Sequence, residues 1–389
     1  MSIRKSSHDA LDGGAQNPMR RRLLRLGALT AVTAGASELG LFAAAAQAQA
    51  TDRAEVIGIT PDLVKAAQRE GEVFLRYSSP ENLYPPVAAA FKEKYGINLI
   101  TDRKVGPLGH QVFAQEERAN RHVMDVVETG DPTGVFTLDR EGFYLHYTLD
   151  GLDKKLSPEF CLPNLAYGPL LVSMVVSYNP DLLSHQDAKR IFKTWNGALD
   201  PRFNNAIGIS SPKTVALSFA LNLMWYQNAK YGMDFIRKLG KQNMRVYRGS
   251  AQGREDLASG AISVMCSGWE SAEMEGFERG TKVAWTYADQ HPVYPNLYIA
   301  ISKRAPHPNA ARLFSAWLFT PEGADAYAKS QSRTSVKGIP DTRSAIAKLK
   351  QTDWWQPYPE SVGWAPDVNY WSANFTKLSN EMEVALGGK

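Results

Sequence analysis

The chain has 389 residues, of which 44% are hydrophobic and 22% charged, and its formal net charge is +4 at pH 7. This length fits two domains, and the composition is ordinary for a globular protein. Six basic and three acidic residues lie in the first fifty positions, so the rest of the chain has a net charge of +1. That value leaves no basic surplus of the kind that nucleic-acid-binding proteins use.

The first fifty residues read as an export signal. Three arginines, Arg20-Arg21-Arg22, precede two leucines, a moderately apolar stretch follows, and Ala46-Gln47-Ala48-Gln49-Ala50 supplies the small residues of a cleavage site. A membrane anchor is the alternative, but Glu38 in the middle of the apolar stretch argues against it. We therefore expect residues 1–50 to be a Tat-like signal peptide, cleaved after Ala48 or Ala50, and the mature chain to be periplasmic.

The first half of the mature chain alternates helical and strand patterns. The ranges expected to be helical are 61–70, 87–95 (behind Pro85 and Pro86) and 109–120, and the strands are 73–77, 97–101 and 124–132. Strands that alternate with helices are typical of an α/β fold with a largely parallel sheet.

The second half repeats this alternation. We expect strands at 168–178, 206–210, 244–247, 261–265 and 296–302, and helices at 215–231, 233–239, 250–260, 307–319, from 320 and 374–386. The runs 171–177 and 297–302 are long and continuously β-prone, so we expect them to pass between two lobes.

Two strands end in the same tripeptide. Ser78-Ser79-Pro80 follows the first strand, and Ser210-Ser211-Pro212 ends the run from Ala206. Ser211 suits an N-cap and Pro212 the first helical position, so each joint should offer free backbone N–H groups at a helix start. Ordinary helix-start chemistry explains either joint alone, whereas the pair suggests two lobes facing a common cleft.

An ordered set of stretches carries a family resemblance. They are 71–77 with 87–97, 124–127, 193–195 with 199–203, 259–262, and 307–311 with 320–323. The set resembles extracellular solute-binding proteins of ABC importers, in the iron(III)/thiamine/polyamine/phosphonate branch. The resemblance implies a periplasmic-binding-protein type II fold: lobe 1 at 51–170 plus 300–340, lobe 2 at 171–299, two hinge strands, and a C-terminal helical tail at 341–389. It further implies capture of a solute between the lobes and delivery to a membrane permease.

The resemblance also places the loops after equivalent strands around the ligand. The residues it assigns to the cleft are Ser78, Ser79, Glu128, Thr129, Gly130, Asp131, Ser211, Lys213, Thr214, Ser267, Trp269, Glu270 and Tyr294. For Asp131 an N-capping role is an equal alternative, and for Lys213 an exposed first-turn position is. Trp269 is the residue we most expect to form a wall of the pocket.

The cleft chemistry favours a small organic ligand. Serine hydroxyls, helix starts and Lys213 suit an anionic or strongly hydrogen-bonding end, whereas Glu128, Asp131 and Glu270 would suit an ammonium group. Iron(III) members of the family carry adjacent tyrosines in the loop that here reads Cys266-Ser267-Gly268-Trp269. We therefore expect no metal and no cofactor, with iron(III) transport as the alternative.

The same sequence also bears on functions other than solute binding. A Gly-x-Ser-x-Gly nucleophile motif is absent from the sequence, so we expect no enzyme, although a periplasmic sensor or hydrolase on this fold is a further alternative. Cys161 and Cys266 are the two cysteines, and we expect two free thiols. The expected partners are a small-molecule ligand and an ABC permease of the inner membrane, with no nucleic acid and a monomeric chain.

Overall fold

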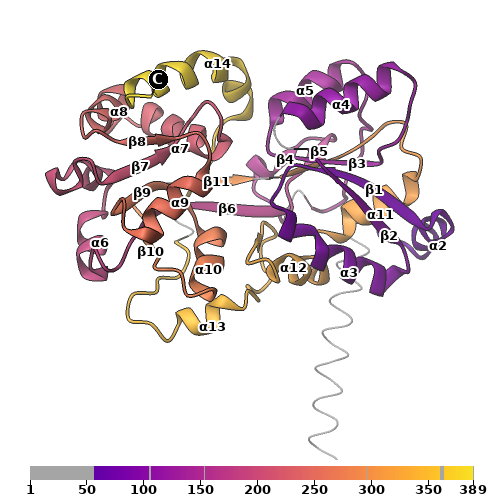
Figure 1. The fold of residues 1–389 in the computed structure, drawn as a ribbon. Coiled ribbons are helices and arrows are strands. Elements are labelled where there is room, and N and C mark those ends of the chain that lie inside the picture. The colour runs from indigo at the N-terminus through magenta and orange to yellow at the C-terminus, as the bar shows by residue number, and fades with distance from the viewer. Residues whose placement is uncertain (1–56, 105–106, 153, 296, 360–362, 389) are drawn as a thin grey trace, which may run out of the picture. The chain divides into compact units, whose positions relative to one another are not determined.

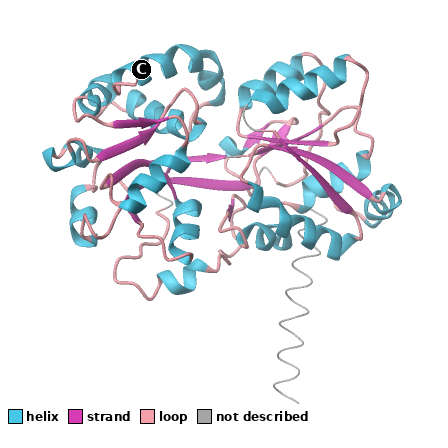
Figure 2. Cartoon of the chain, viewed as in Figure 1, coloured by secondary structure: helices cyan, strands magenta, loops and turns pink. Residues whose placement is uncertain are grey.

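Two lobes, each built on its own sheet, make up the described part of the chain (Figure 1 and Figure 2). The computed structural model describes residues 57–104, 107–152, 154–295, 297–359 and 363–388, so the predicted leader lies outside it. No helix of these residues combines the length and the apolar character needed to cross a membrane. The α/β class with two lobes is confirmed.

Lobe 1 contains a six-stranded sheet in the order β2-β1-β3-β12-β5-β4. Its strands are β1 (Glu72–Tyr77), β2 (Asn98–Arg103), β3 (Val126–Thr129), β4 (Cys161–Leu162), β5 (Ala166–Tyr167) and β12 (Tyr298–Ile301). β1 runs parallel to both β2 and β3, as the alternation of strands and helices predicts, and β12 joins β3 antiparallel. The carboxyl ends of β1 and β3 therefore lie at the same edge.

Helices cover both faces of this sheet. They are α2 (Pro61–Glu70), α3 (Tyr84–Tyr95), α4 (Pro107–Arg118), α5 (Pro132–Arg140), α11 (Pro308–Trp317) and α12 (Pro321–Ala328). Val73 and Leu75 of β1 point into the core beneath α3 and α11, whereas Phe74 between them packs toward α4 and α5. This two-residue period is what a strand buried on both faces requires.

Lobe 2 is built on the second sheet, in the order β14-β11-β6-β9-β7-β8, with β10 and β13 also paired to β6. Its strands are β6 (Leu170–Tyr178), β7 (Ile207–Ser210), β8 (Arg245–Tyr247), β9 (Val264–Trp269), β10 (Ala284–Thr286), β11 (His291–Pro295), β13 (Arg333–Thr334) and β14 (Gly363–Trp364). Its helices are α6 (His185–Ile191), α7 (Ala216–Gln227), α8 (Gly232–Gly240), α9 (Ser250–Ser259), α10 (Glu270–Glu278), α13 (Ala345–Leu349) and α14 (Val368–Ala385).

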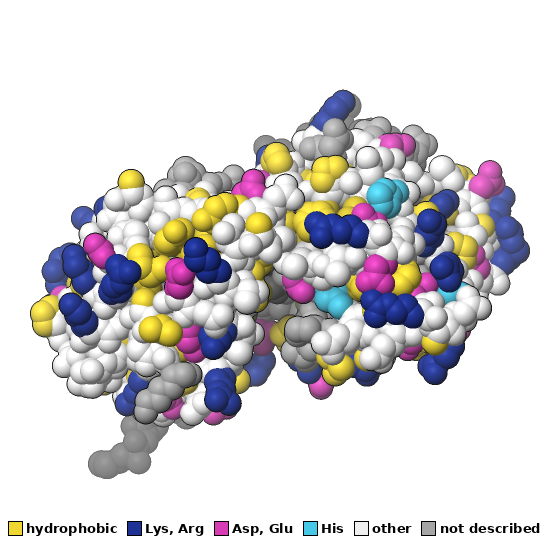
Figure 3. All heavy atoms as spheres, turned by 90° about the horizontal axis from the view of Figure 1, so that it is seen from above, with side chains coloured by type: hydrophobic (Ala, Val, Ile, Leu, Met, Phe, Trp, Pro, Cys, Tyr) yellow, Lys and Arg dark blue, Asp and Glu magenta, His cyan; other side chains and the backbone are white. Residues whose placement is uncertain are grey.

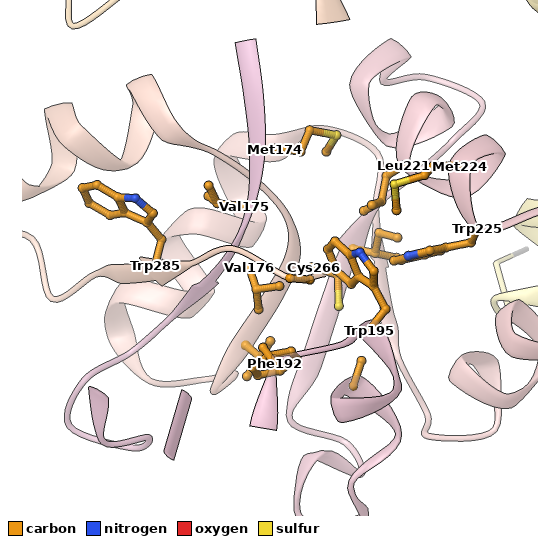
Figure 4. Close-up of a cluster of buried hydrophobic side chains, with 14 of the residues drawn as sticks. Met174, Val175, Val176, Phe192, Trp195, Leu221, Met224, Trp225, Cys266 and Trp285 are labelled. Atoms are coloured by element: carbon orange, nitrogen blue, oxygen red, sulfur yellow. The ribbon is translucent and has the colours of Figure 1, made fainter. Parts of the chain in front are cut away.

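The core of lobe 2 is rich in tryptophan and encloses one of the cysteines. The rings of Trp195 and Trp225 meet edge to face with centroids 5.0 Å apart, and Cys266 lies beside Trp195 and Val176 (Figure 4). Burial raises the pKa of the Cys266 thiol to about 12, which keeps it protonated and unreactive. Cys161 and Cys266 form no disulfide in the described part of the chain.

Two strands connect the lobes. β6 leaves lobe 1 at Leu170 and pairs with β11 near Val172 before it pairs with β9 from Met174 onward. The return path is β11, which leads into β12 of the lobe 1 sheet. The predicted return at 297–302 is therefore a few residues late, because Tyr298–Ile301 already pairs with β3.

Helix α14 touches both lobes. Trp371, Leu378 and Met382 pack into the lobe 2 core, while Val368 packs against the cluster between α4, α5 and the lobe 1 sheet. The Thr133 hydroxyl of α5 donates to Ser372 Oγ at 3.2 Å. The helix starts six residues before the predicted residue 374, capped by Asp367, which accepts from the Tyr370 N–H at 2.7 Å.

The predicted start of α3 and the predicted N-cap of α7 are wrong, although α7 begins one residue from its predicted start. α3 begins at Tyr84, so Pro85 and Pro86 lie inside its first turn, where proline is tolerated because those N–H groups need no helical partner. Ser211 does not cap α7, which begins at Ala216 after Val215. Its hydroxyl instead accepts from the Lys213 N–H at 3.2 Å, a local turn that competes with the helix.

Candidate functional site

The first Ser-Ser-Pro joint surrounds a buried carboxylate. Ser79 Oγ donates to Glu128 Oε2 at 2.6 Å, and Ser78 Oγ donates to Oε1 at 3.1 Å. Burial raises the pKa of Glu128, and the hydrogen bonds from Ser79 and Ser78 act in the opposite direction. Since no basic group pairs with it among the described residues, Glu128 is held by neutral donors, and its burial fixes the loop that follows β1.

The loop after β3 is organised by its own hydrogen bonds. Thr129 Oγ1 lies 3.1 Å from His110 Nε2 and accepts from the Asp131 N–H at 3.0 Å. Asp131 caps α5 by accepting from the Thr133 N–H at 3.0 Å, and its side chain stays 41% exposed. Burial lowers the pKa of His110, while Asp131 nearby acts to raise it. Gly130 lies between these two polar residues. Asp131 therefore occupies the N-cap position that the sequence offered as the alternative to ligand contact.

The second Ser-Ser-Pro joint meets the C-terminal helix. Ser211 is buried and donates to Glu383 Oε2 of α14 at 2.7 Å. Thr214 is exposed and donates to the Arg248 carbonyl at 2.7 Å, and Lys213 is exposed beside it. Ser211 is thus covered by α14, whereas Thr214 contacts the segment that leads into α9.

The end of β9 carries three predicted residues in three different settings. Ser267 Oγ is buried and accepts from the Ser210 N–H at 2.7 Å, which ties β9 to β7. Glu270 is buried and accepts from Tyr287 Oη at 2.7 Å and from Arg343 Nη1 at 3.1 Å. Trp269 between them is half-buried, with its ring beneath the Arg254 guanidinium, whose carbon lies 5.9 Å from the ring centroid.

A cavity of ≈ 120 Å³ lies between the lobes and is lined by residues from both of them. Lobe 1 contributes Ser79 and the segment around Asn82, and lobe 2 contributes Trp269, Arg254 and Glu275. Asn82 Nδ2 donates to Glu275 Oε1, a hydrogen bond that joins the lobes directly. The cavity therefore brings together Ser79 and Trp269, both of which the sequence predicts at the cleft, but not Ser211, although the pairing of the two Ser-Ser-Pro joints predicted Ser211 there too.

Sequence reasoning missed the other polar residues of this lining, among them Asn82, Arg254 and Glu275. Arg254 lies in the middle of α9, Glu275 in α10 and Asn82 in the short η1 helix (Glu81–Leu83), so none follows a strand directly. The only available signal was their position one or two turns beyond a predicted strand-end loop.

Of the other predicted residues, Tyr294 lies in β11, where its backbone pairs with Val172, but its side chain is outside the described part of the structure. None of the remaining predicted residues lines this cavity. Seen from above, the surface is hollowed along the boundary between the lobes (Figure 3). The described residues hold no cluster of three or more His, Cys, Asp or Glu that could bind a metal ion.

Sequence comparison decides the family. The model of the bacterial extracellular solute-binding protein family matches residues 125–360, which is more than half of the chain. The chain belongs to this family. No curated protein sequence is significantly similar to it.

Solved structures of solute-binding proteins share the fold. The substrate-binding protein of an ABC transporter from Agrobacterium tumefaciens superposes with a TM-score of 0.64 at 14% identity, covering 81% of this chain and 94% of that one. Iron-bound HitA from Pseudomonas aeruginosa gives 0.62 at 18% identity, covering 80% and 99%. An extracellular solute-binding protein from Bordetella parapertussis gives 0.66 at 11% identity, covering 82% and 99%. The resemblance found in the sequence is confirmed, and these identities establish the fold alone.

Proposed function

We propose that the mature chain is the substrate-binding component of an ABC importer, which captures a small organic solute between its lobes and delivers it to an inner-membrane permease. The cavity shared by Ser79 and Trp269 carries this proposal, because a ligand there touches both lobes at once. Such contacts exist only in a closed form, so binding favours closure about β6 and β11. The chain works in the periplasm as a monomer without catalysis, after export through its Tat-like leader.

Polar groups at the cavity support an organic solute with an anionic or strongly hydrogen-bonding end. HitA is an iron-bound structure of the same fold, so iron(III) is the alternative cargo. A trivalent hard cation needs several anionic oxygen ligands. Glu270 is already paired with Arg343, and Glu128 is enclosed by serines, which leaves neither carboxylate free for a metal.

Native mass spectrometry of the mature chain purified from the periplasm tests the proposal. We expect a copurified solute of low mass, and small-angle scattering should show a more compact chain with that solute than after its removal. Any true ligand should also raise the melting temperature by mass action. If saturation with a verified solute left the dimensions of the chain unchanged, closure of the lobes around the solute would be contradicted. Submicromolar iron(III) binding would identify iron(III), and not an organic solute, as the cargo.

A further inference from the structure

The charged side chains of the cavity between the lobes are not equivalent. Among the described residues of its lining, Arg254 carries the positive charge and Glu275 the negative one. Glu275 is already engaged, since Oε1 accepts from Asn82 and Oε2 accepts from Arg279 Nη2 at 2.7 Å. Both of its carboxylate oxygens therefore already accept a hydrogen bond, and the donor to Oε2 lies outside the cavity.

The guanidinium of Arg254 is much less engaged. Its one hydrogen bond to a described residue runs from Nη2 to the Ala272 carbonyl at 2.6 Å, and no described carboxylate oxygen lies within 4.0 Å of its nitrogens. A guanidinium has five N–H donors in a planar fork that matches a carboxylate. The Ala272 contact and the Trp269 ring hold this fork in place, so little side-chain entropy remains to be lost on binding.

The size and charge of the surroundings restrict the ligand. A volume of ≈ 120 Å³ is small beside the several hundred Å³ of typical drug-sized pockets. Glu273 of α10 is buried and does not line the cavity; burial raises the pKa of its carboxyl group, which favours the neutral form, although the nearby Arg254 guanidinium acts in the opposite direction. A dianion would be repelled by the Glu275 carboxylate of the lining, whereas a single carboxylate would balance Arg254.

We propose that Arg254 is the anion-binding residue of the cavity and that it takes the carboxylate of a small monocarboxylate solute, with Trp269 stacked behind it. This inference rests on the proposed function and names the substrate class of the same site. The second end of the solute faces Asn82 and Glu275, so a neutral or ammonium end fits there and a second carboxylate does not.

Calorimetric titration of the mature chain with five small probes tests the assignment. The probes are propanoate, β-alanine, propylamine, succinate and methylphosphonate, which separate carboxylate, zwitterion, amine, dicarboxylate and phosphonate. The variants are R254Q and R254K, with R190Q as the matched control, because Arg190 is an exposed arginine of lobe 2 outside the cavity. Circular dichroism and melting temperature check that each variant folds.

We expect the wild type and R190Q to bind propanoate and β-alanine more tightly than the other three probes. R254Q should lose ~10- to 100-fold in affinity for them, the loss expected for a hydrogen bond to a charged group. R254K should lose less affinity, because lysine keeps the positive charge and lacks only the planar pair of donors that a guanidinium offers to a carboxylate. If R254Q fails to fold, R254K carries the comparison.

Three results would overturn the inference. They are equal propanoate binding by wild type and R254Q, tighter binding of propylamine, succinate or methylphosphonate than of the carboxylates, and no binding of any probe by the wild type. None of these results contradicts the proposed capture of a solute between the lobes. That proposal is tested separately, by the copurified solute and its effect on compaction.

Discussion

The two Ser-Ser-Pro joints have the same sequence and the same place at the end of a parallel strand, yet the structure uses them differently. In lobe 1, Ser79 donates to the buried Glu128 and lines the cavity between the lobes. In lobe 2, Ser211 donates to Glu383 of the C-terminal helix and does not line that cavity. In both cases the partner is a glutamate from a distant part of the chain.

That partner decides what each joint can do. Glu128 comes from β3, the neighbour of β1, so it holds the first joint at the strand edge where ligands of α/β proteins bind. Glu383 comes from α14, which covers the second joint instead. A short motif at a strand end therefore shows where a site could form, and the element packed on it shows whether the site stays open.

The largest expected effect is the loss of stability when Glu128, the buried acid of the first joint, is replaced. Glu128→Ala removes the acceptor of two serines and leaves a cavity, so we expect a loss of about 2–4 kcal/mol in unfolding free energy. The matched change in lobe 2, Glu383→Ala, should cost only about 1 kcal/mol, because α14 packs mainly through apolar residues. Chemical denaturation of both variants measures the difference, and equal losses would contradict the contrast between the joints.

The next largest effect is on solute affinity and concerns Trp269, which lobe 2 contributes to the wall of the cavity. Trp269→Ala should weaken binding of the copurified solute by about 1–3 kcal/mol, since the ring leaves the pocket and Arg254 loses its support. Trp355→Ala, a half-buried tryptophan outside this lining, is the control. Calorimetry that gives the same affinity for both variants would remove Trp269 from the site.

A smaller effect separates the two joints by function. Ser79→Ala and Ser211→Ala each remove one hydrogen bond to a buried glutamate, so each should cost about 1 kcal/mol of stability. Only Ser79 lines the cavity, so only Ser79→Ala should also change the affinity for the solute. Titrating both variants with one solute checks this, and an affinity change in Ser211→Ala would show that the second joint also reaches the ligand.

The smallest expected effect is a pH dependence. Because burial raises the pKa of Glu128, the folded chain holds this proton more tightly than the unfolded one. The free energy of unfolding therefore falls as pH rises through the interval that starts at the ordinary glutamate pKa of about 4.3 and ends at the raised value.

Glu128→Gln removes this titration. Its stability relative to wild type should be more favourable at pH 8 than at pH 5, as followed by denaturation at both values. Glu255→Gln, at an exposed acid of α9, is the matched control. A difference between Glu128→Gln and wild type that does not change with pH would show that Glu128 keeps its ordinary pKa.

Local patterns predicted the fold well where they were periodic. The alternation from Pro61 to Thr129 gave the parallel arrangement of β1, β2 and β3, because buried strands and amphipathic helices have different periods. Boundaries failed where two local preferences compete. Ser211 could cap a helix or form a turn, and its distant contact with Glu383 favours the turn.

The site was predictable only in its strand-end residues. Ser79 follows β1 and Trp269 is the last residue of β9, and the structure brings both to one cavity. Glu270 also follows a strand, but Arg343, which binds it, is 73 positions away in sequence and no local pattern pairs them. Arg254 was missed for the same reason, since its side chain reaches Ala272 in the next helix.

Helix α14 has a consequence for how far the molecule can open. It packs into lobe 2, yet its first turns contact lobe 1 through Val368 and Ser372. The proposed rotation of the lobes about β6 and β11 must therefore break these contacts or carry the helix along. Contacts at the start of α14 would therefore oppose opening, and its extent would depend on the C-terminal helix as well as on the two connecting strands.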